Sequence, residues 1–151
     1  MLLEGAELFF RHQERLIESK QEGHPVIKLV YIGRKRDDVS SKDFYDYWLN
    51  KHGPLVRKVA SALRARKYVQ SHTIAPEVGA QLAQSRGMGE GYDGITEVWW
   101  DSLADLTAAF GTADGQEAGR LLVEDEAKFV DLKRSFIFLT EEHTIFDFPS
   151  S

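Results

Sequence analysis

The chain of 151 residues contains no cysteine and no long apolar run. The absence of cysteine excludes disulfide frameworks, thiolate zinc sites and thiol nucleophiles. No stretch approaches the roughly 18 apolar residues of a membrane-spanning helix. The acidic start, Met1–Glu7, lacks the positive charge of a signal peptide. The sequence therefore predicts a cytoplasmic protein that does not enter a membrane.

Positive charge is also in the minority. Lys and Arg number 19 against 24 Asp and Glu, which gives a net charge of -5. Such a chain is a poor binder of phosphate backbones, so nucleic acid is not an expected partner. The hydrophobic fraction of 42% and the charged fraction of 28% are those of an ordinary globular domain.

Motifs for metals and nucleotides are missing as well. The five histidines (12, 24, 52, 72 and 143) include no i, i+4 pair, the spacing that places two imidazole ligands on one helix face. No glycine-rich nucleotide fingerprint follows a predicted strand, and no Gly-x-Ser-x-Gly occurs. We expect neither a metal site nor a cofactor.

Hydrophobic periodicity predicts an N-terminal helical extension, residues 1–24, before a domain that spans residues 25–148. Dense β-branched and aromatic residues predict four strands, at 26–32, 66–74, 95–100 and 135–139. Helical spacing predicts a helix from Ser40 to about Leu63 and two short helices between residues 102 and 129. The order β-α-β-β-α-β is the ferredoxin-like plan of the α+β class.

Two features inside this plan predict local departures from regular structure. Gly53-Pro54 falls within the first helix, and because Pro54 has no N–H to donate, a kink or break is expected there. The segment 79–94 contains five glycines, which indicates an exposed, mobile connection.

The strands are apolar on both faces. In the first strand Val30 and Ile32 alternate with Leu29 and Tyr31, and in the last, residues 136 and 138 oppose 137 and 139 with apolar side chains throughout. Both faces therefore need cover. Either the N-terminal helix covers the second face, or a second copy packs sheet against sheet and closes a dimeric α/β barrel. We favour the homodimer.

Two adjacent motifs carry a resemblance to a known family. Asp-Phe-Tyr-Asp-Tyr-Trp (43–48) and Lys-His-Gly-Pro-Leu-Val (51–56) resemble the Phe-x-x-Tyr-Trp…His-Gly-Pro-Leu-Val signature of EthD-like proteins. Residues 68–72 and 92–100 are similar to that family's second and third strands, and residues 124–131 to its late-helix motif. The likeness extends from about residue 26 to 146.

This resemblance implies a dimeric α+β barrel without a prosthetic group. It also implies two kinds of role, because family members are tied to degradation of an ether fuel additive beside a haem monooxygenase, and fungal relatives to dehydration or decarboxylation of polyketide intermediates. The N-terminal extension is not part of the family pattern.

His52 is the sharpest candidate for catalysis. It shares an apolar helix face with Phe44 and Trp48, one residue before the interruption at Gly53. An imidazole in such a place can stay neutral near pH 7 and act as an acid or a base. The alternative is a structural histidine that hydrogen-bonds the interrupted backbone.

Further candidates lie on the predicted strands. Tyr68, Gln70 and His72 share one strand face, and Asp93, Glu97 and Trp99 share another. We assign His52, His72 and Glu97 to catalysis. Substrate binding is assigned to Tyr45, Trp48, Tyr68, Gln70, Asp93 and Trp99.

Each strand candidate has a structural alternative. Tyr68, Gln70 and His72 can face water at a sheet edge, and the aromatic residues can be core. Glu97 can form a plain ion pair with Lys28 or Arg34. Asp125 and its neighbours are expected on a solvated helix face.

Together these observations predict a cofactor-independent enzyme for proton-transfer chemistry on a small hydrophobic or aromatic, oxygenated ligand. Enolisation, dehydration and decarboxylation need only proton transfer in a pocket that excludes water. A role beside an oxidoreductase rests on the resemblance alone. The alternative is a non-catalytic binding or accessory dimer, and in a third interpretation every motif is architectural.

Overall fold

The computed structural model describes residues 26–151, so the predicted helical extension 1–24 lies outside the described residues. The strands are β1 (Ile27–Gly33), β2 (Lys67–His72), β3 (Gly94–Trp100) and β4 (Phe136–Glu141). The helices are α2 (Ser41–Tyr47), α3 (Gly53–Val59), α4 (Pro76–Gln84), α5 (Leu103–Phe110) and α6 (Ala113–Glu126), with a π-helical turn η1 (Trp48–His52) and a 3-10 turn η2 (Leu132–Arg134).

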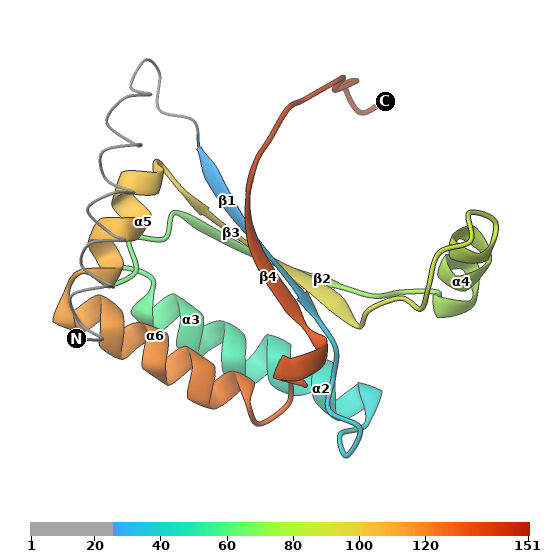
Figure 1. The fold of residues 1–151 in the computed structure, drawn as a ribbon, viewed down its shortest axis with the longest axis horizontal. Coiled ribbons are helices and arrows are strands. Elements are labelled where there is room, and N and C mark those ends of the chain that lie inside the picture. Colours follow the sequence, from blue (N-terminus) through green and yellow to red (C-terminus); the bar gives the residue numbers. More distant parts are fainter. Residues whose placement is uncertain (1–25) are drawn as a thin grey trace, which may run out of the picture.

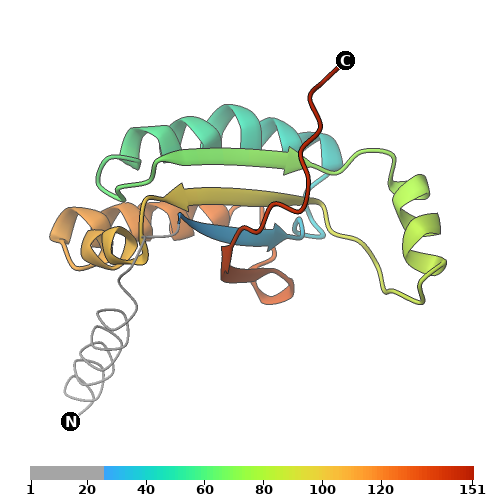
Figure 2. The ribbon, with the colours of Figure 1, turned by 90° about the horizontal axis from the view of Figure 1, so that it is seen from above.

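The four strands form one antiparallel sheet in the order β2-β3-β1-β4. This order confirms the ferredoxin-like α+β prediction. Helices α2, α3, α5 and α6 lie on one side of the sheet (Figures 1 and 2). In the register, Tyr31 pairs with Thr96 and Ile137, and these side chains face the helices, whereas Val30, Glu97 and Phe138 pair on the outer face.

Short polar side chains begin the helices where the sequence predicts. Ser40 Oγ accepts a hydrogen bond from the Asp43 N–H at 3.1 Å, and Ser102 Oγ accepts from Asp105 N–H at 3.1 Å. Thr112 caps α6 in the same way, through Gly115 N–H at 3.0 Å. Helix α6 therefore starts before Asp114-Gly115, earlier than the sequence suggests.

The first long helix does not break at Gly53-Pro54. Because Pro54 cannot donate, the chain widens into the π turn η1, where the Gly53 N–H bonds the Trp48 carbonyl five residues back. Pro54 then sits in the first turn of α3, where no intrahelical donor is needed. The expected interruption is a change of helical register along one continuous helix.

The glycine-rich connection contains a helix that the sequence analysis missed. Helix α4 starts at Pro76, has an acid in its first turn at Glu77 and includes only one of the five glycines, Gly79. It stands apart from the rest of the fold and buries none of its residues (Figure 1). The predicted exposure of this connection is confirmed, and its first part is helical.

Two apolar clusters hold the helices against the sheet. One contains Phe44, Trp48, Phe129 and Val130, and the other joins α3 to α6 through Val59, Leu63 and Ala118. Within residues 26–151, no helix is both long and apolar enough to cross a membrane.

Candidate functional site

A cavity of about 210 Å³ lies between the helix-facing side of the sheet and the helices. Most of its wall is apolar and includes Leu29, Phe44, Val98, Trp100, Leu122 and Phe129. The residues that bring polar side-chain atoms to it are Tyr31, Trp48, His52, Tyr68, Thr96 and Glu126. Since an apolar cavity of roughly 150 Å³ accommodates benzene, this one has room for a single ring with small substituents.

His52 and Asp125 form a buried pair beside this cavity. The last residue of η1 meets the last turn of α6, with His52 Nδ1 2.8 Å from Asp125 Oδ2. Only 4% of His52 and 7% of Asp125 are exposed. The Tyr47 hydroxyl donates to Asp125 Oδ1 at 2.6 Å, and Lys128 Nζ donates to the same oxygen at 3.2 Å. The expected solvated helix face at Asp125 is therefore wrong.

The surroundings define the protonation of the pair. Burial alone would raise the pKa of Asp125, but the hydrogen bonds from Tyr47, His52 and Lys128 hold it below its ordinary value. Burial lowers the pKa of His52 below 6.5 in spite of this carboxylate. His52 is thus neutral at pH 7, with its proton on Nδ1 and the lone pair on Nε2. No hydrogen bond from residues 26–151 reaches Nε2.

Glu126 is a candidate site residue that the sequence analysis missed. Glu126 lines the cavity, and within the described part of the chain its carboxyl group has neither a hydrogen bond nor an ion pair. Burial, and then the negative charge of Asp125, raise the pKa of Glu126 from 4.5 to about 7. Near neutral pH this carboxyl is therefore poised both to accept and to donate a proton.

A sequence signal for Glu126 does exist. It lies four residues after Leu122 and three before Phe129, so helical periodicity places it on the apolar stripe of α6. The acidic run from Glu124 to Glu126 obscured this, since a run of acids is typical of a solvated surface.

Two tyrosines, Tyr31 and Tyr68, also line the cavity. The Tyr31 hydroxyl is the one buried side-chain polar atom, among residues 26–151, that lacks a hydrogen-bond partner. The Tyr68 hydroxyl accepts hydrogen bonds from Trp48 Nε1 at 3.3 Å and Gln70 Nε2 at 3.1 Å. Burial is the largest cause of the raised pKa of both tyrosines, so both stay protonated donors.

His72 and Gln70 lie at one end of the cavity without lining it. Gln70 Nε2 donates to the Trp48 carbonyl at 2.8 Å, and Gln70 Oε1 lies 3.0 Å from His72 Nε2. The His72 ring stacks on Trp48 and Tyr45, with ring centroids 4.6 and 5.0 Å apart. Burial lowers the pKa of His72. The strand face from Tyr68 to His72 thus supports the cavity through a hydrogen-bonded network.

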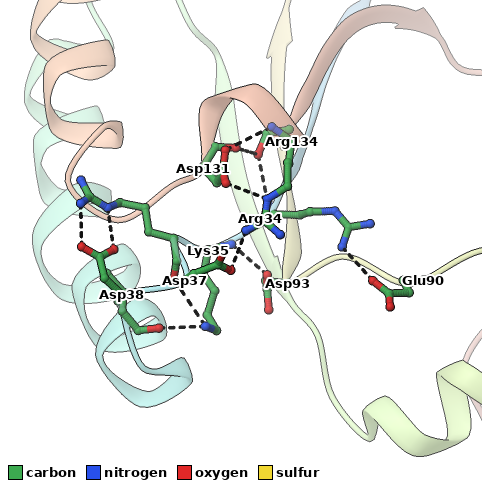
Figure 3. A network of polar contacts seen from close by, with 11 residues as sticks. Arg34, Lys35, Asp37, Asp38, Glu90, Asp93, Asp131 and Arg134 are labelled. Atoms are coloured by element: carbon green, nitrogen blue, oxygen red, sulfur yellow. Dashed lines mark hydrogen bonds and ion pairs between the residues drawn. The ribbon is translucent and has the colours of Figure 1, made fainter.

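Tyr45 and Asp93 lie at the same end of the sheet and are joined by a hydrogen bond. The Tyr45 hydroxyl donates to the Asp93 carbonyl at 2.8 Å, and Asp93 Oδ2 accepts from the Lys35 N–H at 2.8 Å. Figure 3 shows Asp93 beside the surface ion pair of Arg34 and Glu90. The backbone carbonyl and the carboxylate of Asp93 thus both accept hydrogen bonds from other segments of the protein. Neither Tyr45 nor Asp93 lines the cavity.

Glu97 and Trp99 lie on the opposite, outer face of the sheet. Glu97 pairs with Lys28 Nζ at 2.7 Å, which is the plain ion pair considered as its alternative. Trp99 Nε1 donates to Glu142 at 2.6 Å. Of the nine predicted site residues, the structure brings His52, Trp48 and Tyr68 to the cavity and separates Glu97 and Trp99 from it.

No group of three or more His, Asp or Glu side chains suited to hold a metal ion occurs within the part of the chain that the structure describes.

The comparisons with known proteins agree on the fold. Residues 36–133 match the family model of the EthD domain. A search of curated proteins finds no match.

Three solved structures share the architecture. An ethyl tert-butyl ether D (EthD) family protein from Bacillus halodurans is 21% identical, with a TM-score of 0.53 over 78% of this chain and 99% of its own. A dimeric ferredoxin-like protein of unknown function from Bacteroides fragilis is 15% identical, with a TM-score of 0.51 over 80% and 100%. Hydroxynitrile lyase from Passiflora edulis is 12% identical, with a TM-score of 0.54 over 82% and 98%.

Proposed function

From the premise that this chain belongs to the EthD domain family, we propose that it is an enzyme that moves protons on a small, hydrophobic, oxygenated molecule held in the cavity. The observation that carries the proposal is the Glu126 carboxyl, which lines an apolar cavity with a pKa of about 7 and no partner among residues 26–151. A general acid or base works best when its pKa lies near the working pH. Glu126 is the primary acid–base group.

His52 is the second proton-transfer group in this proposal. Its neutral Nε2 accepts a proton on the cavity side, while Asp125 fixes the ring and the Nδ1 tautomer from behind. Asp125 is accordingly a positioning residue, because it contacts His52 and does not line the cavity. Because the two groups have different proton affinities, one can remove a proton from one atom of the ligand while the other delivers a proton to another atom.

The fold is compatible with such chemistry in at least one other protein. The Passiflora edulis structure is that of a hydroxynitrile lyase, and it shares the fold at 12% identity. The choice between dehydration, decarboxylation and isomerisation rests on the ligand that the cavity selects.

We also propose that the functional unit is a homodimer formed through the outer face of the sheet. Phe136 and Phe138 project from that face with exposed fractions of 58% and 47%, beside Ile32 and Val30. An apolar surface of this kind on a soluble protein marks an interface. The Bacteroides fragilis protein of the same fold is described as dimeric.

The test is turnover of a panel of single-ring ketones, β-hydroxy ketones and β-keto acids in D₂O, followed by NMR. Deuterium uptake, loss of water or loss of CO₂ from at least one compound is expected. Glu126→Gln should lower that rate by about a hundredfold or more, because it removes the acid–base group while keeping its shape. Glu90→Gln is the matched control, since Glu90 is 92% exposed. The wild-type rate should change with a midpoint near pH 7.

Two results would contradict the proposal in different ways. Turnover that Glu126→Gln leaves unchanged would show that the acid–base group is another residue. Saturable binding of panel members without any turnover would establish a binding module, which is the alternative role.

A further inference from the structure

The hydroxyl groups of Tyr31 and Tyr68 have no role in the proton transfer described above, yet both belong to the cavity wall. A buried hydroxyl without a partner costs folding free energy, and a phenylalanine would fill the place of Tyr31 without that cost. The unpaired Tyr31 hydroxyl therefore indicates a partner that arrives with a ligand.

The geometry brings the two hydroxyls toward one region of the sheet. Tyr31 on β1 pairs with Thr96 on β3, and Thr96 pairs in turn with Gln70 on β2, two residues from Tyr68. All these side chains face the helices. The Tyr68 hydroxyl accepts from Trp48 and Gln70, which leaves its own hydrogen to donate. The hydroxyl of Thr96 also lies within hydrogen-bonding reach of the Tyr68 hydroxyl.

Glu126 lines the same cavity as both tyrosines. Its charge contributes to the raised pKa of Tyr31 and of Tyr68, and the charge of Tyr68 contributes to that of Tyr31. Two residues with hydroxyl donors and one carboxyl base thus line a single, mostly apolar cavity. Two donors match the two lone pairs of a carbonyl oxygen.

We propose that Tyr31 and Tyr68 together bind the oxygen of a small carbonyl compound and stabilise the negative charge that develops on it when Glu126 takes a proton from the adjacent carbon. The inference rests on the proposed function and names its substrate class, an enolisable single-ring carbonyl compound. The electrons of the broken C–H bond form the new C=C bond, and the carbonyl π electrons move to the oxygen, which the two hydroxyls hold as an enolate. Return of the proton from Glu126 to carbon or oxygen completes the step.

Binding of 4-nitrophenol tests the oxygen site without turnover, because its yellow phenolate carries the charge of an enolate oxygen on a single ring. The measurement is made at pH 8 on Glu126→Gln, since the ionised carboxylate of the wild type repels an anion. Glu126→Gln should bind the phenolate more tightly than the wild type. Adding Tyr31→Phe or Tyr68→Phe should weaken phenolate binding at least about tenfold, the loss expected for one hydrogen bond to a charged group.

The neutral isostere 4-nitrotoluene reports on the shape of the cavity. Its affinity should change less than about twofold in Tyr31→Phe, because no hydrogen bond to it is lost. Tyr92→Phe is the matched control, since Tyr92 packs on Arg34 outside the cavity, and it should alter neither affinity. Equal losses for both probes, or none for the phenolate, would overturn the oxygen site. Failure of both probes to bind would overturn the ligand class.

The phenolate-binding test of the oxygen site and the turnover test of the proposed function can fail independently. If turnover depends on Glu126 while the tyrosine variants bind phenolate normally, only the oxygen site is wrong. If the tyrosines hold phenolate while Glu126→Gln leaves turnover unchanged, the oxygen site stands and the base is misassigned.

Discussion

Asp125 and Glu126 are neighbours in the chain and hold their protons very differently. Asp125 receives hydrogen bonds from Tyr47, His52 and Lys128, which keep its pKa low despite its burial. Glu126 receives none from the described residues, and burial raises its pKa to about 7. A helix turns by about 100° per residue, so adjacent side chains enter separate environments. Environment, rather than residue type, separates a positioning carboxylate from an acid–base group.

The raised pKa of Glu126 predicts a pH-dependent cost to stability. The folded pKa of about 7 lies above the ordinary 4.5, so the folded state holds the proton more tightly than the unfolded chain. The stabilising contribution is complete below pH 4.5 and is lost as the pH rises through 7. At pH 8, Glu126→Gln should therefore raise the free energy of unfolding by up to about 3 kcal/mol, and at pH 4.5 by very little.

Urea unfolding at several pH values, at one protein concentration, measures this difference. Glu124→Gln is the control, because the Glu124 carboxylate pairs with Arg120 at the exposed surface. Parallel stability curves for the wild type and Glu126→Gln between pH 5 and 8 would contradict the buried, unpaired carboxyl.

The sequence allows part of the site to be predicted at this scale. His52 and Trp48 are found by helical spacing on an apolar face, and Tyr68 by strand alternation. Glu97 is misleading because alternation identifies which residues share a face but not which face the helices cover. Asp125 and Glu126 are missed because their burial depends on packing of α6 against η1, far apart in sequence.

At the scale of elements, the contact between η1 and the start of β3 sets the position of Trp48. A Cβ atom on Gly94 would lie 2.5 Å from the Trp48 ring and 2.7 Å from the Ser71 carbonyl oxygen. Only glycine permits this approach of strand to helix. The approach in turn keeps Trp48 stacked on His72 and at the cavity wall.

Gly94→Ala should destabilise the protein by about 2 kcal/mol or more, because overpacking displaces a buried ring and strand backbone. Gly91→Ala is the matched control, since a Cβ there meets nothing within 4 Å, and it should change stability by less than about 0.5 kcal/mol. Urea unfolding of the two variants and the wild type measures these changes in the free energy of unfolding. Equal stabilities would show that Trp48 can shift without cost.

The elements themselves are predicted best where local chemistry decides them. Ser40 and Ser102 act as caps as their spacing indicates. The π turn is not predicted, because a proline inside a helix indicates a kink or break equally well. Helix α4 is missed because its single glycine was grouped with the four that follow it.

At the scale of the whole molecule, strands that are apolar on both faces are the basis of the proposed homodimer. Light scattering should give about twice the 17.2 kDa of one chain. Phe138→Glu should shift the mass toward a single chain, because a charge in a buried apolar interface is costly. Leu82→Glu is the control, since Leu82 is equally apolar and exposed but lies on α4, away from the sheet.

A single-chain mass for the wild type at micromolar concentration would contradict the dimer. A Phe138→Glu variant that retains the double mass would move the interface away from the outer face.

Strand β4 pairs only with β1 among the described residues, so its far side is an open edge. Its first five residues, Phe-Ile-Phe-Leu-Thr, carry no charge and no proline. Such a segment is a template for cross-β stacking into fibrils. A variant that stays a single chain leaves the apolar side chains of β4 uncovered as well as its edge, so it should aggregate more readily than the proposed homodimer.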